Sequence, residues 1–191
     1  SMPGAPFIYY GDEIGMNYVE NLVSVEGGYG RTGSRSPMQW DSSTNAGFSS
    51  APAEKLYIPL DPSPKRPTVQ AQQQNKKSLY HEIQKLIKIR QEHDALQSRG
   101  EIEFIYAKKN EYPLAYVRSC TGKNQSGEKI LVIINPSEKE VSFPCDLKKL
   151  GGASGDSTDL LKNAIYTFGG KIKLEGKKIF VAGKSAGFYS L

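Results

Sequence analysis

The stretch "KILVIINPS", residues 129–137, decides how the second half of the chain folds. Its apolar residues follow one another without a polar interruption, so neither face of an extended segment would be polar. A short run of this kind is typical of a central strand that is covered on both faces. The run ends at Asn135-Pro136, a turn signal. The stretch therefore predicts the central strand of a sheet.

Short strands with period-two patterns surround this run. Apolar residues alternate with polar neighbours at Ile102, Phe104, Tyr106, Val141 and Phe143. The segment "KIKLEGKKIFVAG" reads as a hairpin with Glu175-Gly176 near its tip, and a last strand follows it. Seven or so short strands punctuated by Gly, Asn and Pro predict an antiparallel β-sandwich over residues 101–191.

Residues 78–96, "SLYHEIQKLIKIRQEHDAL", precede these strands and predict an amphipathic helix. Apolar residues recur on one face of a 3.6-residue period, at Leu79, Ile83, Leu86 and Ile87. Asn75 or Ser78 can serve as the N-cap. Gly100 lies just beyond the end, where a stop signal is expected.

Residues 1–76 have a different texture. One short apolar segment, Phe7–Tyr10, reads as a buried-type strand and is followed by Gly11, Asp12 and Glu13. A long stretch rich in Gly, Ser, Pro and Asn comes next, without sustained periodicity. Loops of this length are usually functional or lean on another element. We expect that this region cannot bury its own apolar side chains.

Composition excludes several classes of protein. The 191 residues are 38% hydrophobic and 24% charged, which is ordinary for a chain with a real core. No apolar run approaches the ~20 residues that cross a bilayer, so no membrane partner is expected. The net charge of +5 comes from scattered lysine pairs rather than one block, and we expect no nucleic-acid partner.

The cysteines and histidines do not predict a metal site. Cys120 and Cys145 lie in separate strand-like segments, where reduced core thiols or a bridge are both open, with reduced thiols favoured. His81 and His93 are twelve positions apart on one predicted helix and cannot chelate one ion.

Three motifs in order resemble one family. These are "PGAPFIYYGDEIGM", "GRTGSRSPMQWDSSTNAGFS" and "SLYHEIQKLIKIRQEHDALQSRG". Together they resemble the C-terminal part of the α-amylase family of glycoside hydrolases, closest to its α-glucosidase, oligo-1,6-glucosidase and trehalose-synthase branch. The resemblance implies the eighth strand, the following loop and the eighth helix of a (β/α)8 barrel in residues 1–100. Residues 101–191 would then be the antiparallel Greek-key sandwich called domain C.

The resemblance also bears on catalysis. Retaining glycoside hydrolases hold two carboxyl groups ~5–5.5 Å apart across the scissile bond. In this family the catalytic carboxylates lie on barrel strands four, five and seven, which would precede Ser1. The resemblance therefore implies a fragment of an enzyme that hydrolyses or transfers α-glucosidic linkages, inactive alone. It implies no catalytic residue, no cofactor and no metal ligand in this chain.

Four residues are candidates for substrate binding in the intact enzyme. By resemblance, Arg35 reaches the pocket for the non-reducing-end sugar, and a guanidinium suits hydroxyls and carboxylates. Trp40 could stack on a sugar or anchor its loop. Asp12 and Glu13 would lie at the active-site face of the barrel, where bracing the barrel mouth is the alternative.

Other readings and partners stay open. Residues 101–191 could be an autonomous carbohydrate-binding or interaction module, although the only tryptophan lies outside them. The expected partners are an α-linked gluco-oligosaccharide and the rest of the catalytic barrel. An exposed opening strand would also invite a dimer through Pro6–Tyr10. The compartment is undetermined, with the cytoplasm slightly favoured.

Overall fold

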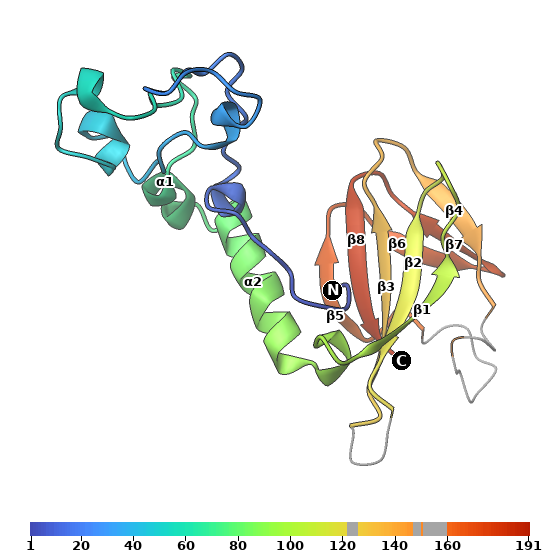
Figure 1. The fold of residues 1–191 in the computed structure, drawn as a ribbon. Helices are drawn as coiled ribbons and strands as arrows, with labels where there is room; N and C mark the ends of the chain where they lie inside the picture. The colour runs from blue at the N-terminus through green and yellow to red at the C-terminus, as the bar shows by residue number, and fades with distance from the viewer. Residues whose placement is uncertain (122–125, 147–149, 151–159) are drawn as a thin grey trace. The chain divides into compact units, whose positions relative to one another are not determined.

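The computed structural model describes residues 1–121, 126–146, 150 and 160–191 (Figure 1). They form two compact units. One consists of Phe7–Ile87 and is called the loop unit below. The other combines Ser1–Pro6 with Lys88–Leu191 and is called the β unit. These units do not coincide with the expected boundary after residue 100, because the segment from Lys88 onward is part of the β unit.

The β unit is built from antiparallel strands in two sheets. One sheet has the order β1-β2-β3-β8-β5 and the other has the order β4-β7-β6. The strands are β1 (Glu101–Tyr106), β2 (Leu114–Ser119), β3 (Lys129–Asn135), β4 (Val141–Pro144), β5 (Ala164–Phe168), β6 (Ile172–Glu175), β7 (Lys178–Val181) and β8 (Ser185–Ser190). The expected antiparallel sandwich and its β6–β7 hairpin are confirmed. The place of β8 beside β3 joins strands distant in the sequence, as Greek-key connections do.

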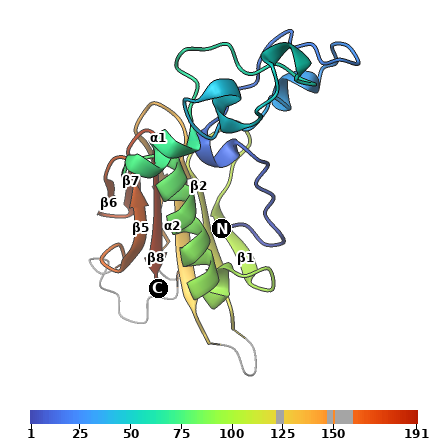
Figure 2. The same ribbon diagram turned by 90° about the vertical axis from the view of Figure 1, so that its left-hand side faces the viewer.

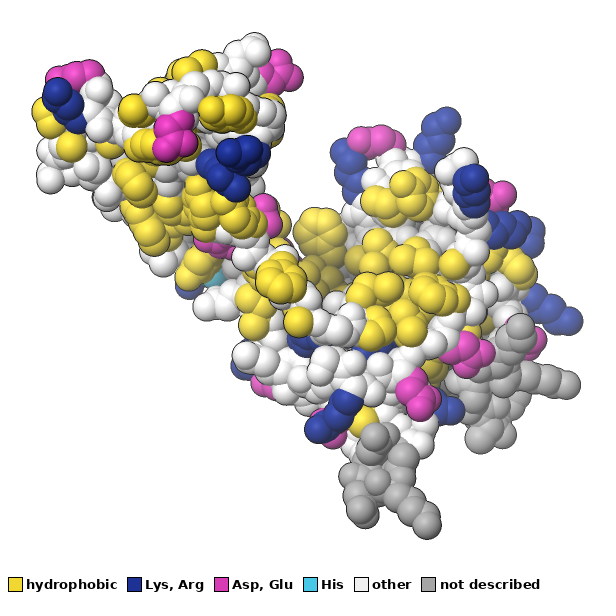
Figure 3. Space-filling model, viewed as in Figure 1, with side chains coloured by type: hydrophobic (Ala, Val, Ile, Leu, Met, Phe, Trp, Pro, Cys, Tyr) yellow, Lys and Arg dark blue, Asp and Glu magenta, His cyan; other side chains and the backbone are white. Residues whose placement is uncertain are grey.

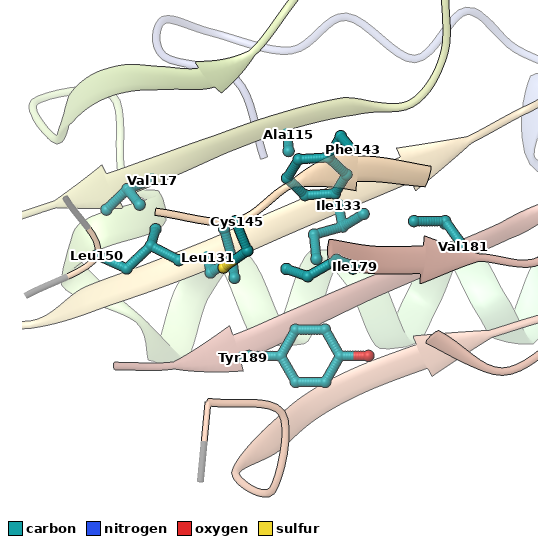
Figure 4. Close-up of a cluster of buried hydrophobic side chains, with 10 residues drawn as sticks. All are labelled: Ala115, Val117, Leu131, Ile133, Phe143, Cys145, Leu150, Ile179, Val181 and Tyr189. Carbon is teal, nitrogen blue, oxygen red and sulfur yellow. The ribbon is translucent and has the colours of Figure 1, made fainter. Parts of the chain in front are cut away.

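The two sheets enclose one hydrophobic core (Figure 4). Its buried members are Ala115, Val117, Leu131, Ile133, Phe143, Cys145, Leu150, Ile179, Val181 and Tyr189. The rings of Tyr106 and Phe143 meet across the sheets with their centroids 5.3 Å apart. Both cysteines are buried and free, as favoured from the sequence. Burial raises the pKa of the Cys145 thiol, with a smaller contribution from Asp146, so this thiol stays protonated.

The central strand ends at a polar residue that connects the sheets. Asn135 follows an apolar run in β3 whose first four residues, 130–133, are buried, and it is itself 0% exposed. Its side-chain nitrogen donates to the carbonyl oxygens of Lys139, Val181 and Ala182 at 2.9, 3.1 and 2.9 Å. Its side-chain oxygen accepts from the backbone N–H and the hydroxyl of Ser137. Because Val181 ends β7, Asn135 joins β3 of one sheet to β7 of the other.

A buried arginine lies on the face of β2 that points away from the hydrophobic core. Arg118 is 0% exposed and donates to the carbonyl oxygens of Glu101, Gln97 and Gly100 at 3.0, 2.7 and 3.0 Å, and to that of Ser1. In the described part of the chain no carboxylate pairs with it. The positive charge is therefore balanced by the dipoles of four backbone carbonyls.

The first residues of the chain are held by the same side of the β unit. Arg90 donates to the carbonyl oxygens of Met2 and Gly4 at 2.9 and 2.6 Å. The hydroxyls of Ser1 and Tyr116 lie 2.7 Å apart. Residues 1–4 are thus held mainly through their backbone carbonyls, and the Ser1 hydroxyl adds one side-chain contact.

The predicted helix at residues 78–96 forms as α2 (Leu79–Glu92). The hydroxyl of Ser78 accepts the backbone N–H of His81 at 3.5 Å, a contact at the N-cap position. Of the two expected caps, Ser78 therefore takes this role. The division between the two units falls within α2, after Ile87.

The helix ends earlier than predicted because a carboxylate intervenes. His93 adopts an extended backbone, and a short 3-10 helix, Asp94–Leu96, follows. Glu128 contacts this break twice: one oxygen lies 2.6 Å from Nδ1 of His93, and the other accepts the N–H of Ala95 at 2.8 Å. Glu128 is far away in the sequence, so helical periodicity could not reveal this contact.

The loop unit contains little regular structure (Figure 2). Its helices are short: the 3-10 segments Asp12–Ile14, Thr32–Ser34, Thr44–Gly47 and Ala53–Lys55, then α1 (Val69–Gln74) and the first part of α2. The predicted strand at Phe7–Tyr10 is wrong for this structure. The carbonyl of Tyr9 accepts the N–H of Asp12 at 3.0 Å in a turn instead. A lone strand has no ladder partner to stabilise it.

Large apolar side chains remain exposed on the loop unit, where Figure 3 shows hydrophobic side chains gathered at the surface. They include Phe7, Ile8, Tyr9, Tyr10, Tyr18, Val23, Val25, Tyr29, Trp40, Phe48 and Tyr57. The extreme case is Phe7, which is 95% exposed. The prediction that this region cannot bury its own apolar side chains is confirmed. Pairing of two chains through Pro6–Tyr10 stays a prediction.

Within the described ranges, no helix has both the length and the apolar character that a membrane crossing requires.

Candidate functional site

The loop unit contains a pocket of about 410 Å³, called the Arg35 pocket below. Its lining residues are Tyr10, Glu13, Arg35, Pro37, Met38, Trp40, Phe48, Tyr57 and Ile58. Three of the four predicted substrate-binding residues, Glu13, Arg35 and Trp40, thus meet at one cavity. Asp12 does not line it.

One wall of the pocket comes from a buried segment, residues 36–40. Ser36, Met38 and Gln39 are almost fully buried, whereas Trp40 is half exposed. The backbone N–H of Trp40 donates to the carbonyl of Ala46 at 2.8 Å. The carbonyl oxygens of residues 39 and 40 also have partners, because they accept from the backbone N–H groups of Val69 and Gln70 at the start of α1. The backbone that carries the tryptophan is therefore fixed.

A tight turn places the second aromatic wall. Asn45 and Ala46 have positive φ angles of 52° and 53°, in the left-handed region that non-glycine residues rarely adopt. The side chain of Asn45 stabilises this turn by donating to the carbonyls of Ser49 and Ala51 at 3.0 and 2.7 Å. The turn brings Phe48 to the same pocket as Trp40.

The two carboxylates have different environments. Asp12 is exposed and accepts the N–H of Tyr9 at 2.9 Å. Glu13 is half-buried and accepts the N–H of Gly11 at 2.8 Å with one oxygen. Both therefore brace the turn at residues 9–13, and Glu13 alone also lines the pocket. Whether either carboxylate braces a barrel mouth stays a prediction.

Tyr10 lies between the turn and the buried segment. Its hydroxyl donates to the carbonyl of Ser36 at 3.0 Å. Burial raises the pKa of Tyr10, the neighbouring Tyr9 adds to this effect, and Arg35 acts in the opposite direction. The phenol is therefore a neutral hydrogen-bonding group at neutral pH, not an anion that would pair with Arg35.

Arg35 carries guanidinium N–H groups that can donate to a ligand. It follows the 3-10 helix Thr32–Ser34, and its backbone N–H donates to the carbonyl of Thr32 at 2.9 Å. Among the described residues, its guanidinium makes no hydrogen bond and no ion pair. Arg31, four positions earlier, instead lies over the ring of Tyr29, 5.0 Å from its centroid. The two arginines of this loop thus differ: Arg31 is held by the protein, and Arg35 is available to a ligand.

The arrangement supports binding more than bond cleavage. The pocket combines a guanidinium, one carboxylate and aromatic surfaces, a set that suits a ligand rich in hydroxyl groups. Two-carboxylate glycoside chemistry would need a second acid, and Glu13 is the only acid in the lining. The described residues contain no group of three metal-ligating side chains.

Sequence reasoning missed several lining residues. Phe48 belongs to the quoted "NAGFS" motif, so its position was available as a signal. Tyr57 and Ile58 lie in a Pro-rich stretch without periodicity, and nothing in the sequence pointed to them.

Comparison with protein families gives one match. Residues 1–99 match the family described as "Alpha amylase, catalytic domain". This match covers about half of the chain and includes the whole Arg35 pocket.

Three curated relatives illustrate the similarity. The trehalose synthase/amylase TreS of Mycobacterium tuberculosis is 35% identical over 153 residues, covering 78% of this chain and 24% of the relative. The trehalose synthase of Pimelobacter sp. is 36% identical over 156 residues, covering 80% and 26%. The oligo-1,6-glucosidase of Parageobacillus thermoglucosidasius is 32% identical over 170 residues, covering 74% and 28%. The chain spans about a quarter of the length of these relatives.

Solved structures share the fold. A MUTB mutant from crystals soaked with trehalulose superimposes with a TM-score of 0.74 at 24% identity, covering 99% of this chain and 36% of that one. The trehalulose synthase MutB from Pseudomonas mesoacidophila MX-45 gives 0.64 at 24% identity, covering 84% and 26%. At this identity the likeness concerns the fold alone.

Proposed function

Because the chain belongs to the alpha-amylase family, we propose that it is the C-terminal part of an enzyme that hydrolyses or transfers α-glucosidic linkages of oligosaccharides. In this proposal residues 1–100 end the catalytic (β/α)8 barrel, and residues 101–191 are domain C with a structural role. The relatives named trehalose synthase and oligo-1,6-glucosidase support this substrate class.

The Arg35 pocket is the observation that carries the proposal. The guanidinium of Arg35, which makes no hydrogen bond or ion pair with the residues that the structure describes, lines one cavity with Glu13, Trp40 and Phe48. The chain supplies one carboxylate there, so the two acids of a retaining mechanism come from the preceding part of the enzyme. The exposed apolar surface of the loop unit is consistent with contacts to that part.

The first experiment separates the chain from the complete enzyme. The 191-residue chain and the complete gene product are assayed on maltose, isomaltose and trehalose. We expect glucose release or isomerisation only with the complete gene product. Activity of the chain alone, or inactivity of both on every α-glucoside, contradicts the proposal.

The second experiment is Arg35→Ala in the complete enzyme. Loss of charge-assisted hydrogen bonds to substrate costs about 1.5–3 kcal/mol, so kcat/KM should fall by about 10- to 100-fold. Arg35→Lys keeps the charge without the planar fork and should restore part of the activity.

Arg99→Ala is the matched control. Arg99 is an exposed arginine of the β unit that pairs with Asp94 at 2.8 Å. Its replacement should leave kcat/KM within about two-fold of wild type. Equal values for the Arg35 and Arg99 variants would remove Arg35 from the substrate site.

A further inference from the structure

A second pocket, of about 320 Å³, lies in the loop unit and is called the Tyr29 pocket below. It is lined by Tyr18, Asn21, Leu22, Val23, Gly28, Tyr29 and Gly30. Its volume falls near the lower end of the range of small-molecule sites. None of the residues that line the Arg35 pocket belongs to it.

The ring of Tyr18 is held at its hydroxyl end by a hydrogen bond and by close packing. Its hydroxyl donates to the carbonyl of Gly30 at 3.1 Å. The ring lies so close to Gly33 that a Cβ there would come within 2.7 Å of it and within 2.2 Å of the carbonyl oxygen of Val19. Only glycine allows this approach, and the N–H of Val19 donates to the Gly33 carbonyl at 3.0 Å. Tyr18 is thus preorganised before any ligand binds.

The ring of Tyr29 is fixed in the same way. Its hydroxyl donates to the carbonyl of Glu26 at 3.0 Å, and its backbone N–H donates to the hydroxyl of Thr32 at 3.0 Å. The guanidinium of Arg31 lies 5.0 Å from the ring centroid. The ring is thus held by one hydrogen bond and a cation, on a backbone held by a second hydrogen bond, so it loses little conformational freedom when a ligand contacts it, which favours affinity.

The chemistry of the lining selects a neutral, hydroxyl-rich ligand. The lining contains two phenol rings, one amide and short aliphatic groups, and no charged side chain. Asn21 lies in the left-handed region with φ 57°, and within the described part of the chain its amide makes no hydrogen bond. A pyranose unit offers hydroxyls to such an amide and an apolar ring face to the tyrosines.

The two pockets share their supporting backbone. The N–H of Val25, within the loop that forms the Tyr29 pocket, donates at 2.9 Å to the carbonyl of Tyr57, which lines the Arg35 pocket. Thr32 joins them a second time: its hydroxyl accepts from Tyr29, and its carbonyl accepts the N–H of Arg35. One rigid loop therefore presents both pockets.

We propose that the Tyr29 pocket binds the third glucosyl unit of an α-linked oligosaccharide whose terminal unit occupies the Arg35 pocket. The proposal rests on the proposed function for the terminal unit. It makes the loop of residues 17–33 a determinant of substrate length, because only substrates of three or more units can reach beyond the reacting pair.

The test compares substrate lengths in the complete gene product. Tyr18→Ala and Tyr29→Ala are assayed on maltose and maltotriose and on isomaltose and isomaltotriose. Loss of one aromatic contact should lower kcat/KM for the trisaccharide by about three- to ten-fold and leave the disaccharide within about two-fold. Tyr18→Phe and Tyr29→Phe keep the rings and should retain most trisaccharide activity.

Phe168→Ala is the control variant, since Phe168 is a half-exposed aromatic residue of β5. It should change neither substrate. Equal losses on both lengths, or no loss on either, would overturn the second subsite while leaving the proposed function intact.

Calorimetric titration of maltotriose and isomaltotriose into the same proteins separates the two proposals. If the wild type binds a trisaccharide without cleaving it, and the alanine variants bind at least three-fold more weakly, the subsite stands and the enzymatic proposal fails. A wild type that neither cleaves nor binds these sugars overturns both.

Discussion

Arg118→Met is expected to destabilise the β unit by about 2–4 kcal/mol, because several carbonyl acceptors lose their donor. Methionine preserves the length of the side chain but offers no donor. The carbonyl of Gly100 would then stay buried without its partner, and the part-buried carbonyls of Gln97 and Glu101 would lose theirs. Since whole domains are stable by ~5–15 kcal/mol, this is a large share of the total.

The charge itself is not lost on folding. Burial, with a smaller contribution from Arg90, lowers the pKa of Arg118, yet a guanidinium stays protonated in proteins. Arg118→Lys keeps a charge but concentrates its donors on one nitrogen, so about half of the loss should be recovered.

The measurement must report on the β unit. The only tryptophan, Trp40, belongs to the loop unit, so its fluorescence follows the wrong part of the chain. Amide hydrogen exchange of β2 and β3 reports the free energy of opening directly. Arg99→Met, at an exposed ion pair, should cost under ~1 kcal/mol. Unchanged amide exchange rates in Arg118→Met would show that the hydrogen bonds between Arg118 and these carbonyls contribute no stability.

Asn135→Ala is expected to cost about 2–4 kcal/mol, because three carbonyls of the buried sheet junction lose their donor. The change removes the connection from β3 to Val181 and Ala182 and leaves the backbone N–H of Ser137 without its acceptor. Denaturation followed by far-ultraviolet circular dichroism of the sheet signal measures the loss. Ser142→Ala, at an exposed position of β4, is the control and should change stability by less than ~0.5 kcal/mol.

Asn135→Asp adds a pH signature to the same site. A carboxylate would face three carbonyl oxygens in a buried position, which raises its pKa in the folded state. Below the unfolded-state value of ~4 the acid is neutral in both states, so the variant is least destabilised there. As the pH rises above ~4, the unfolded state gains stability by ionising, and the deficit relative to wild type should grow. A deficit independent of pH between 3.5 and 7 would contradict the contacts of Asn135.

Local sequence patterns were sufficient to predict the strands that pair with other strands of this chain. The run at residues 129–137 predicted β3 in the middle of a sheet, and period two predicted the β6–β7 hairpin. Helical periodicity predicted α2 but not its end, because Glu128 contacts His93 and Ala95 from a distant part of the sequence.

Gly100 has a different role from the one that the sequence predicted. The sequence pattern predicted that this glycine ends the helix. In the structure a Cβ at this position would lie 2.7 Å from a guanidinium nitrogen of Arg118 and 2.3 Å from the carbonyl oxygen of Ala95. The glycine makes room for the buried arginine, a requirement that only tertiary structure reveals.

The candidate site was predicted in part. The motif around Arg35 and Trp40 identified two lining residues, and Glu13 followed from its place after the opening segment. Phe7–Tyr10 failed as a strand because propensity cannot create the neighbouring strands that a ladder needs. Tyr57 and the whole Tyr29 pocket depend on irregular loop paths, which carry no period to detect.

The β unit is discontinuous in sequence, since residues 1–6 belong to it and residues 7–87 do not. Arginine side chains at positions 90 and 118 fasten the two segments together through main-chain oxygens alone. A peptide-bond cut inside the intervening stretch would accordingly leave residues 1–6 attached to the β unit by these hydrogen bonds. Residues 7–87 can therefore be replaced in circular permutants or domain grafts, provided that Arg90 and Arg118 are retained.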